Sequence, residues 1–376
     1  MDMKRQYELY KDVYNKVLVE TASSGAYIGG KIVKEFEEEF AKYVGTKYAV
    51  SCGSGTDALV LALKAFNIGA GDEVIVPGFT FFATAEAVAN VGATPVFVDV
   101  EEDVYCIDPK KLEEKITDKT KAIIPVHLYG NCADMDSINE IAKKHSLKVI
   151  TDCAQSTGTE YQGNRKNALG DVACFSFFPT KNLGGIGDGG ILVTDDEYVA
   201  LAAKSYSTHG SGKNFEDEES DKVVDKYHNH HIGYNSRLDS LQAAFLSKRL
   251  EHLDKLLDER SQVAEYYLNN IDSSKYQLPK RREDTKHSYY LFALRHKNAG
   301  EIMQVLNEKG IESKTYYPVP VHLQKAFTEL GYKNGALPVT ESLCDTTFAI
   351  PLFPGIKLEE MKFVVDTLNS IEPEKL

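Results

Sequence analysis

The chain has 376 residues, of which 43% are hydrophobic and 26% are charged, a composition typical of a globular protein with room for a large domain and a smaller one. Its 43 basic and 56 acidic side chains give a formal net charge of −13, which argues against a nucleic-acid-binding surface. No apolar run is long enough to cross a membrane, and the six cysteines lack the paired spacing of disulfides, so we expect a reduced, cytoplasmic protein.

The first half of the chain alternates between strand and helix patterns. An amphipathic helix is predicted over residues 1–18, a linker of small residues over 21–30 and a second helix over 33–43. The strands that we expect next are 47–55, 72–78, 94–100, 122–130 and 147–155, separated by helices at 56–66, 81–91, 109–115 and 136–145. This alternation is typical of βαβ units around a mostly parallel sheet. Residues 172–178 and 190–195 form two further strands without a helix between them, so at least one of these is expected to run antiparallel.

The second half of the chain indicates a smaller unit. A single long helical region is predicted over residues 237–270, and the segments after it read as an α+β unit that ends in a helix over 357–371. We therefore expect a large domain over residues 1–250 and a small domain over residues 251–376. The polar segment 214–231 is predicted to be a long, solvated loop. Its histidines, His228, His230 and His231, are not expected to bind metal.

Several polar residues follow predicted strands, where ligands collect in parallel sheets. The amides of Gly55 and Thr56 open a helix and could bind a phosphate, although such turns are common. Asp152 could hold a protonated ring nitrogen or only cap the next turn. Phe81 could stack on a ligand or belong to the core, and Ser176 could donate to a phosphate or to the backbone.

Lys181 lies in the stretch FSFFPTKNLGGIGDGG, between an aromatic strand and a run of glycines. By itself this lysine could extend its ammonium group to solvent. Pyridoxal phosphate needs a specific set of groups to hold it, and this chain offers all of them. They are a phosphate-binding turn, an aromatic face, a strand-end carboxylate and a lysine 29 residues after that carboxylate. The lysine would form a Schiff base with the cofactor, and the carboxylate would keep the ring nitrogen protonated.

Longer motifs make the sequence recognisable. They are YIGGKIVKEFEEEFAKYVGTKYAV, SGTDAL, VPGFTFFATAEAV, PVHLYGNCADMD, DCAQSTG, FSFFPTKNLGGIGDGG, GYNSRLDSLQAA and YYPVPVHLQKAF. Over nearly its whole length the chain resembles the DegT/DnrJ/EryC1/StrS family of sugar-nucleotide aminotransferases. The resemblance implies an α/β protein of PLP-dependent fold type I, like aspartate aminotransferase, with a mixed, mostly parallel sheet and a smaller C-terminal α+β domain.

The resemblance also implies a role for each candidate residue. Lys181 would be the Schiff-base lysine and proton shuttle, Asp152 would pair with the pyridine nitrogen, and Gln155 would contact the phenolic oxygen of the cofactor. The remaining cofactor contacts would be Phe81 on the ring and Gly55, Thr56 and Ser176 on the phosphate.

Two further implications concern a partner subunit and the substrate. Asn235 would reach the phosphate in the neighbouring subunit, which implies a homodimer with shared active sites. Tyr317 and His322 would lie near the sugar nucleotide.

The form of the lysine loop bears on the substrate. The family often has histidine-proline-x-lysine followed by a threonine-rich GEGG, whereas this chain has PTKNLGGIGDGG. This form is similar to the branch that aminates C3 of dTDP-3-keto-6-deoxyhexoses with L-glutamate as the donor. The alternative is amination at C4 of a UDP-, GDP- or dTDP-4-keto sugar.

Three other functions are disfavoured. A sugar dehydratase of this family would carry histidine in place of Lys181. The segment GGIGDGG does not have the G-x-G-x-x-G spacing of a nicotinamide-binding turn. A non-catalytic sensor with the same fold would not need Lys181, Asp152 and Gln155 together.

Overall fold

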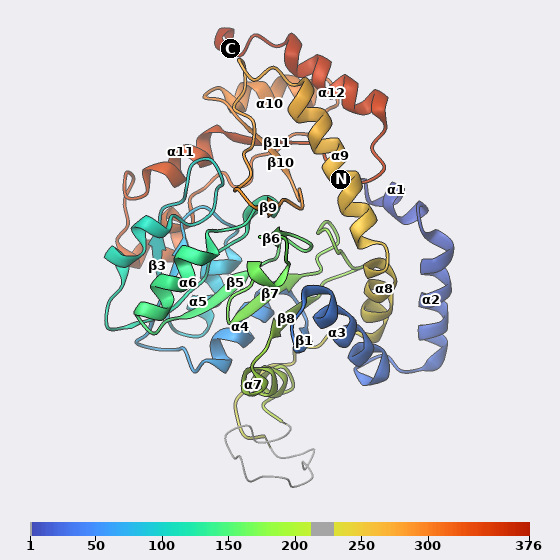
Figure 1. Ribbon diagram of the computed structural model, residues 1–376, viewed down its shortest axis with the longest axis vertical. Helices are drawn as coiled ribbons and strands as arrows, with labels where there is room; N and C mark the ends of the chain where they lie inside the picture. The colour runs from blue at the N-terminus through green and yellow to red at the C-terminus, as the bar shows by residue number, and fades with distance from the viewer. Residues whose placement is uncertain (1, 212–228) are drawn as a thin grey trace.

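A computed structural model of the chain describes residues 2–211 and 229–376. The predicted strands form one central sheet of seven strands in the order β1-β8-β7-β5-β4-β2-β3 (Figure 1). These strands are β1 (Tyr48–Cys52), β2 (Glu73–Pro77), β3 (Thr94–Val98), β4 (Thr120–Ile123), β5 (Lys148–Asp152), β7 (Val172–Ser176) and β8 (Gly190–Thr194). Only β8 runs antiparallel to its neighbours β1 and β7, and all other pairs in the sheet are parallel. The expected α/β class and the expected antiparallel strand are both confirmed.

Helices cover both faces of the sheet because alternate residues of its strands are apolar on both sides. In β7, Val172 and Cys174 pack into one hydrophobic cluster, whereas Ala173 and Phe175 pack into another on the opposite face. The first face is covered by α4 (Gly55–Ala65), α5 (Ala83–Asn90) and α7 (Glu197–Ser207). The second is covered by α3 (Gly30–Val44), α6 (Met135–Lys144) and α8 (Ser240–Leu250).

A break divides the helical region that the sequence pattern predicts as continuous. Helix α8 ends at Leu250, and α9 (Leu253–Asn270) begins three residues later. At the break the ring of His252 stacks on Tyr10, with 4.3 Å between the ring centroids. Tyr10 lies between α1 (Met3–Glu8) and α2 (Lys11–Ser24). A contact between residues so far apart in sequence cannot be seen in local periodicity, which explains the missed break.

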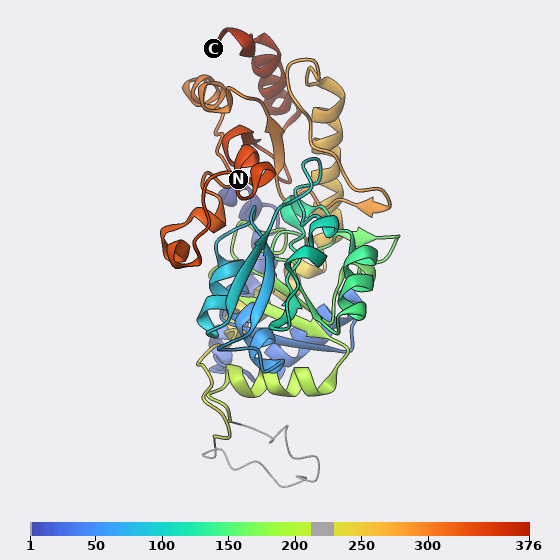
Figure 2. The ribbon, with the colours of Figure 1, turned by 90° about the vertical axis from the view of Figure 1, so that its left-hand side faces the viewer.

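The C-terminal part of the chain packs around its own hydrophobic cluster, on one side of the large sheet (Figure 2). It contains α9, a two-stranded antiparallel sheet and three more helices: β10 (Phe292–Arg295), β11 (Thr347–Ile350), α10 (Ala299–Glu308), α11 (Pro338–Thr346) and α12 (Leu358–Ser370). The first turns of α9 pack with α3 and α8, whereas its later turns pack with α12. The division of domains at residue 250 stays a prediction.

Several short elements connect these layers. Strands β6 (Glu160–Tyr161) and β9 (Thr285–Lys286) form a separate antiparallel pair. The predicted helix at 109–115 is replaced by two single-turn 3-10 helices, η1 (Pro109–Lys111) and η2 (Glu113–Lys115). The other described 3-10 helices are η3 (Leu128–Gly130), η4 (Lys166–Ala168), η5 (Val321–Leu323), η6 (Lys325–Leu330) and η7 (Pro373–Lys375).

Asp99, directly after β3, joins the C-terminal part to the sheet. Its carboxylate accepts hydrogen bonds from the backbone amides of Thr340 at 2.7 Å and Val339 at 3.1 Å, in the first turn of α11. A carboxylate at a helix N-terminus is stabilised by the helix dipole.

Two further expectations from the sequence concern the loop 214–231 and membrane-spanning helices. Most of the predicted loop 214–231 falls in residues 212–228, which lie outside the described residues. No described helix combines the length and apolar character needed to span a bilayer.

Candidate active site

Five of the predicted site residues come from strand ends that meet at one edge of the sheet. Because β1, β5 and β7 run in the same direction, their carboxyl ends lie side by side. Asp152 is the last residue of β5 and Ser176 the last of β7, and α4 begins with Gly55 and Thr56 shortly after β1. Lys181 follows β7 by five residues, in the turn before β8. The topology therefore brings a carboxylate, an ammonium group and a helix N-terminus to one place.

The N-terminus of α4 has the form of a phosphate-binding turn. Ser54 caps the helix by accepting a hydrogen bond from the amide of Asp57 at 3.1 Å. The amides of Gly55 and Thr56 have no acceptor among the described residues, so they are free to bind an anion at the positive end of the helix dipole. A Cβ atom at Gly55 would lie 2.7 Å from Cβ of Ser176, so only glycine lets the turn approach the end of β7.

Gly53 completes the turn through the segment that carries Asn235. The hydroxyl of Ser236 accepts a hydrogen bond from the amide of Gly53 at 2.9 Å and donates one to Oδ2 of Asp57 at 2.6 Å. Asn235 itself is exposed, beside this contact. The structure thus places Asn235 at the surface next to the turn of its own subunit, and its predicted role in a neighbouring subunit stays a prediction.

The carboxylate of Asp152 is buried and forms no ion pair with another described residue. Its oxygens accept hydrogen bonds from the hydroxyl of Thr84 at 2.8 Å and from the amide of Ala154 at 3.0 Å. Burial raises the pKa of Asp152, although these hydrogen bonds and the charge of Lys181 act in the opposite direction. A cationic N–H donor, such as a protonated pyridine, would relieve the cost of keeping this carboxylate charged.

The side-chain amide of Gln155 is fixed by two hydrogen bonds. Its Oε1 accepts from the backbone amide of Tyr129 at 3.0 Å, and its Nε2 donates to the hydroxyl oxygen of Tyr317 at 2.7 Å. The phenol of Tyr317 is therefore an acceptor toward Gln155 and keeps its own proton to donate elsewhere. Nε2 of Gln155 also has a second hydrogen, which could reach the phenolic oxygen of a cofactor.

Lys181 and Phe81 complete the group around Asp152. The Nζ atom of Lys181 lies 4.6 Å from the centroid of the Tyr290 ring. The ring of Phe81 is 55% exposed and lies 5.6 Å from the ring of Tyr317, measured between centroids, so it is available to stack on a ligand.

His322 does not join this group. Its ring is buried beside Phe97 and Tyr332, and its Nε2 lies 3.1 Å from Oε1 of Glu341. Burial lowers the pKa of His322 despite that carboxylate. The expected contact between His322 and the sugar nucleotide stays a prediction without geometric support.

The predicted absence of a metal site also stays a prediction. His228 lies outside the described residues, and the part of the chain that is described contains no cluster of three potential metal ligands.

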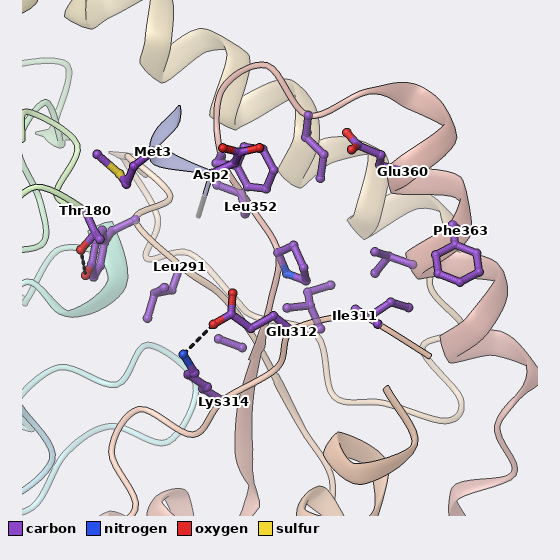
Figure 3. A pocket seen from close by; sticks show the side chains of 18 of the residues that line it. Asp2, Met3, Thr180, Leu291, Ile311, Glu312, Lys314, Leu352, Glu360 and Phe363 are labelled. Atoms are coloured by element: carbon purple, nitrogen blue, oxygen red, sulfur yellow. Dashed lines mark hydrogen bonds and ion pairs between the residues drawn. The ribbon is translucent and has the colours of Figure 1, made fainter. Parts of the chain in front are cut away.

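Sequence patterns missed several residues of the site. Thr84, Tyr129 and Tyr290 contact the predicted residues, and Thr180 and Tyr290 also line a cavity of about 940 Å³. Figure 3 shows Thr180 on one side of this cavity, with Leu291, Leu352 and the pair formed by Glu312 and Lys314 on the others. Tyr129 and Tyr290 lie in the segments HLYG and SYYLF. Aromatic residues in such apolar segments are usually core residues, so the sequence pattern does not indicate a role in a site.

These residues fit pyridoxal phosphate. The free amides at the start of α4 suit the phosphate. Among the residues described, the buried carboxylate of Asp152 has no ion-pair partner of the kind that a protonated ring nitrogen supplies, and Lys181 lies close enough to influence that carboxylate. The close approach of Gly55 to Ser176 leaves the turn open toward the same sheet edge.

Comparisons with known proteins agree with this chemistry. A sequence model described as the DegT/DnrJ/EryC1/StrS aminotransferase family matches residues 10–369. A pleiotropic regulatory protein of Geobacillus stearothermophilus and a dTDP-3-amino-3,6-dideoxy-alpha-D-galactopyranose transaminase of Aneurinibacillus thermoaerophilus are each 42% identical to the chain, over 98% of it and 96% of their own length. A UDP-N-acetyl-3-dehydro-alpha-D-glucosamine 3-aminotransferase of Acidithiobacillus ferrooxidans is 40% identical over the same shares.

Solved structures show the same likeness. DesV of S. venezuelae, in complex with a ketimine intermediate, superimposes with a TM-score of 0.92 at 40% identity, over 98% of this chain and 96% of DesV. NtdA of Bacillus subtilis, with its bound cofactor PMP, superimposes with a TM-score of 0.85 at 33% identity, over 95% of this chain and 80% of NtdA.

The burial of Asp152 predicts opposite effects of one substitution on stability and on cofactor binding. The unfolded chain ionises this carboxyl near pH 3.9, and the raised pKa makes the cofactor-free folded state hold the proton to higher pH. The stability of the cofactor-free protein therefore falls as pH rises from about 4 through the raised pKa. Asp152→Asn removes that fall, so its thermal unfolding midpoint at pH 7 should exceed that of the wild type.

The same substitution should weaken binding of pyridoxal phosphate roughly tenfold or more, because a hydrogen bond to a charged group contributes about 1.5–3 kcal/mol. Thermal unfolding and a cofactor titration would measure both effects. Asp171→Asn, at an exposed carboxylate that accepts a hydrogen bond from the amide of Val149 at 2.8 Å, is the control and should change neither. A lower midpoint for Asp152→Asn would contradict the assigned cost of the buried charge.

Proposed function

We propose that this chain, which belongs to the DegT/DnrJ/EryC1/StrS aminotransferase family, transfers an amino group from L-glutamate to C3 of a dTDP-3-keto-6-deoxyhexose. The protein is a PLP-dependent sugar aminotransferase, as its family and its homologues are. The observation that carries the site assignment is the convergence of Asp152, Lys181 and the α4 turn at one edge of the sheet.

Each of these residues has a distinct task in the proposal. Pyridoxal phosphate, when bound, supplies an electron sink that makes the α-hydrogen of an amino acid acidic. Gly55, Thr56 and Ser176 bind the phosphate, and Asp152 holds a proton on the ring nitrogen. Lys181 would take the proton from the α-carbon of the donor at its Nζ atom, and in the second half of the reaction it would deliver a proton to C3 of the sugar.

The aromatic residues and Gln155 orient and shield the reacting groups. Phe81 stacks on the ring and covers one side of it. The Nε2 atom of Gln155 fixes Tyr317, whose hydroxyl is then directed as a donor toward the substrate. Because Tyr317 lies beside Phe81 and is hydrogen-bonded to Gln155, we propose it as the contact to the sugar.

The choice of C3 and of dTDP rests on two supports. The lysine loop reads NLGGIGDGG rather than the threonine-rich form, and one relative at 42% identity is a dTDP-3-amino-sugar transaminase. Another relative uses a UDP-linked 3-keto sugar at 40% identity, so amination at C3 has broader support than the nucleotide does. The alternative is a C4 aminotransferase for a UDP-, GDP- or dTDP-4-keto sugar.

A substrate panel separates these possibilities. Purified protein with L-glutamate should convert a dTDP-3-keto-6-deoxyhexose to the 3-amino sugar at least tenfold more efficiently than the matched dTDP-4-keto or UDP-3-keto compounds. Such a preference corresponds to about 1.4 kcal/mol of differential transition-state binding. Mass spectrometry and NMR of the product would locate the amine. A product aminated at C4 would overturn the assignment of C3, and faster turnover of the UDP-3-keto sugar would overturn that of dTDP.

We also propose that the protein acts as a homodimer in which Asn235 completes the partner's site. Exposed apolar side chains belong to the same region of the chain as Asn235: Ile232, three residues before it, is 92% exposed, and Ile28, which bridges to Asp239, is 53% exposed. Exposed apolar patches of this kind mark interaction surfaces. The predicted cytoplasmic location stays a prediction.

Mixing two defective variants tests the shared site. Lys181→Ala should abolish activity, and Asn235→Ala should reduce it strongly by weakening phosphate binding. Subunits of the two variants, mixed at equal ratio and allowed to exchange, should regain about a quarter of wild-type activity, because half of the dimers are heterodimers and each has one complete site. If mixing regains nothing although the subunits exchange, Asn235 serves its own subunit or has no role.

A further inference from the structure

The guanidinium of Arg260 is a buried charge that has no acidic partner within residues 2–211 and 229–376. This side chain, on α9, is 1% exposed, and no described carboxylate pairs with it. Burial, with a smaller effect from Arg249, lowers the pKa of Arg260 to about 9, so the group is still charged at neutral pH. Burying a charge without a counter-charge is costly. The contacts of Arg260 must therefore account for its presence.

Every hydrogen bond that the Arg260 side chain forms with a described residue goes to a backbone carbonyl group, in one of two chain segments. Its Nη1 atom donates to the oxygens of Tyr289 at 3.0 Å, Tyr290 at 3.4 Å and Leu352 at 3.5 Å. A carboxylate nearby would draw the guanidinium away from these weaker acceptors. With neutral acceptors alone, the charge fixes the positions of these backbone groups.

The segment that Arg260 holds has an unusual backbone. Tyr289 has a φ of +44°, in the left-handed region that residues with side chains seldom adopt. Its amide donates to Nδ1 of His287 at 2.9 Å, and the amide of Tyr290 donates to the carbonyl oxygen of Tyr129 at 2.8 Å. The turn is thus fixed locally by His287 and from two remote parts of the fold by Tyr129 and Arg260.

The result of this turn is the position of the Tyr290 ring. Tyr290 is 9% exposed, and its ring centroid lies 4.6 Å from Nζ of Lys181. Its hydroxyl lies 3.4 Å from that of Thr180, the residue before Lys181. A cation over an aromatic ring is held electrostatically, so the ring limits where Nζ can lie. Thr180, Leu291 and Leu352 line the adjoining cavity (Figure 3).

We propose that Arg260 is a positioning residue for Lys181, acting through the carbonyl groups of Tyr289 and Tyr290 and the ring of Tyr290. The inference rests on the proposed role of Lys181 and adds two residues to the machinery of that site. It explains both the uncompensated buried charge and the left-handed tyrosine, because each is needed to hold the ring against the lysine.

The test measures two quantities for each variant. One is the rate at which pyridoxal phosphate attaches to the cofactor-free protein, monitored by absorbance, and the other is the thermal unfolding midpoint. Arg260→Met and Tyr290→Leu should each slow attachment about tenfold or more, since a displacement near 1 Å can cost on the order of a hundredfold. The double variant should be no slower than the slower single variant, because both changes act through one ring. Tyr290→Phe retains the ring and should attach cofactor at close to the wild-type rate.

Arg249 provides the matched control, because it is also a buried arginine for which the structure describes no carboxylate partner. Its Nη2 donates to Oε1 of Gln6 at 2.7 Å, and the residue is 3% exposed. Arg249→Met should lower the unfolding midpoint yet leave the attachment rate unchanged. If Arg260→Met does not fold, Arg260→Lys together with Tyr290→Leu and Tyr290→Phe decides the outcome.

Three results would overturn the inference: attachment at the wild-type rate in Arg260→Met, multiplicative effects in the double variant, or an equal slowing in Arg249→Met. Lys181→Ala serves as the blank and should show no attachment signal. If that blank gives the wild-type signal, the proposed role of Lys181 fails, and the inference about Arg260 fails with it. If the blank is silent and Arg260→Met attaches cofactor normally, only the inference about Arg260 fails.

Discussion

The burial of the Asp152 carboxylate without an ion-pair partner among the described residues is the constraint on which the rest of the site depends. Two neutral donors, Thr84 and Ala154, partly stabilise its charge, but burial still raises its pKa. Such a group is costly to the folded protein and useful only when a cationic donor completes it. Its place at the end of a parallel strand, where other strand ends converge, determines where that donor must bind.

The surroundings of Asp152 are held by bonds between distant segments rather than by regular secondary structure. Tyr129 and Tyr289 both have left-handed backbone conformations. The two segments are joined by a hydrogen bond from the amide of Tyr290, the residue after Tyr289, to the carbonyl oxygen of Tyr129. Tyr129 also orients Gln155. A rigid set of side chains at a site reduces the reorganisation that binding and catalysis require. The site is thus built where the sheet meets the C-terminal part of the chain.

Much of this arrangement could be predicted from the sequence, for identifiable physical reasons. Alternation of apolar runs with helical segments predicts parallel strands, and parallel strands place Asp152, Ser176 and the turn at Gly55 at a common edge. The missing helix between residues 178 and 190 correctly predicts the antiparallel strand β8. In each case the signal is local, in a short stretch of residues.

What the sequence did not reveal depends on contacts between remote residues. The break between α8 and α9 follows no glycine or proline and coincides with the stacking of His252 on Tyr10. Thr84, Tyr290 and Arg260 have the sequence signature of ordinary helix or core residues. The fold brings Thr84 to Asp152 and Tyr290 to Lys181, and it places Arg260 against the backbone of Tyr290. His322 lies in a motif that suggests a substrate contact, yet its ring is buried and contacts Glu341.

The most direct test of the central claim is peptide mapping of the protein after borohydride reduction in the presence of pyridoxal phosphate. The reduction fixes the cofactor to the amine that carries it, and mass spectrometry identifies that amine. Our account predicts one modified residue, Lys181, in the peptide that contains PTKNLGGIGDGG. Modification of a different lysine, or an unmodified Lys181 in protein that has bound the cofactor, would contradict it.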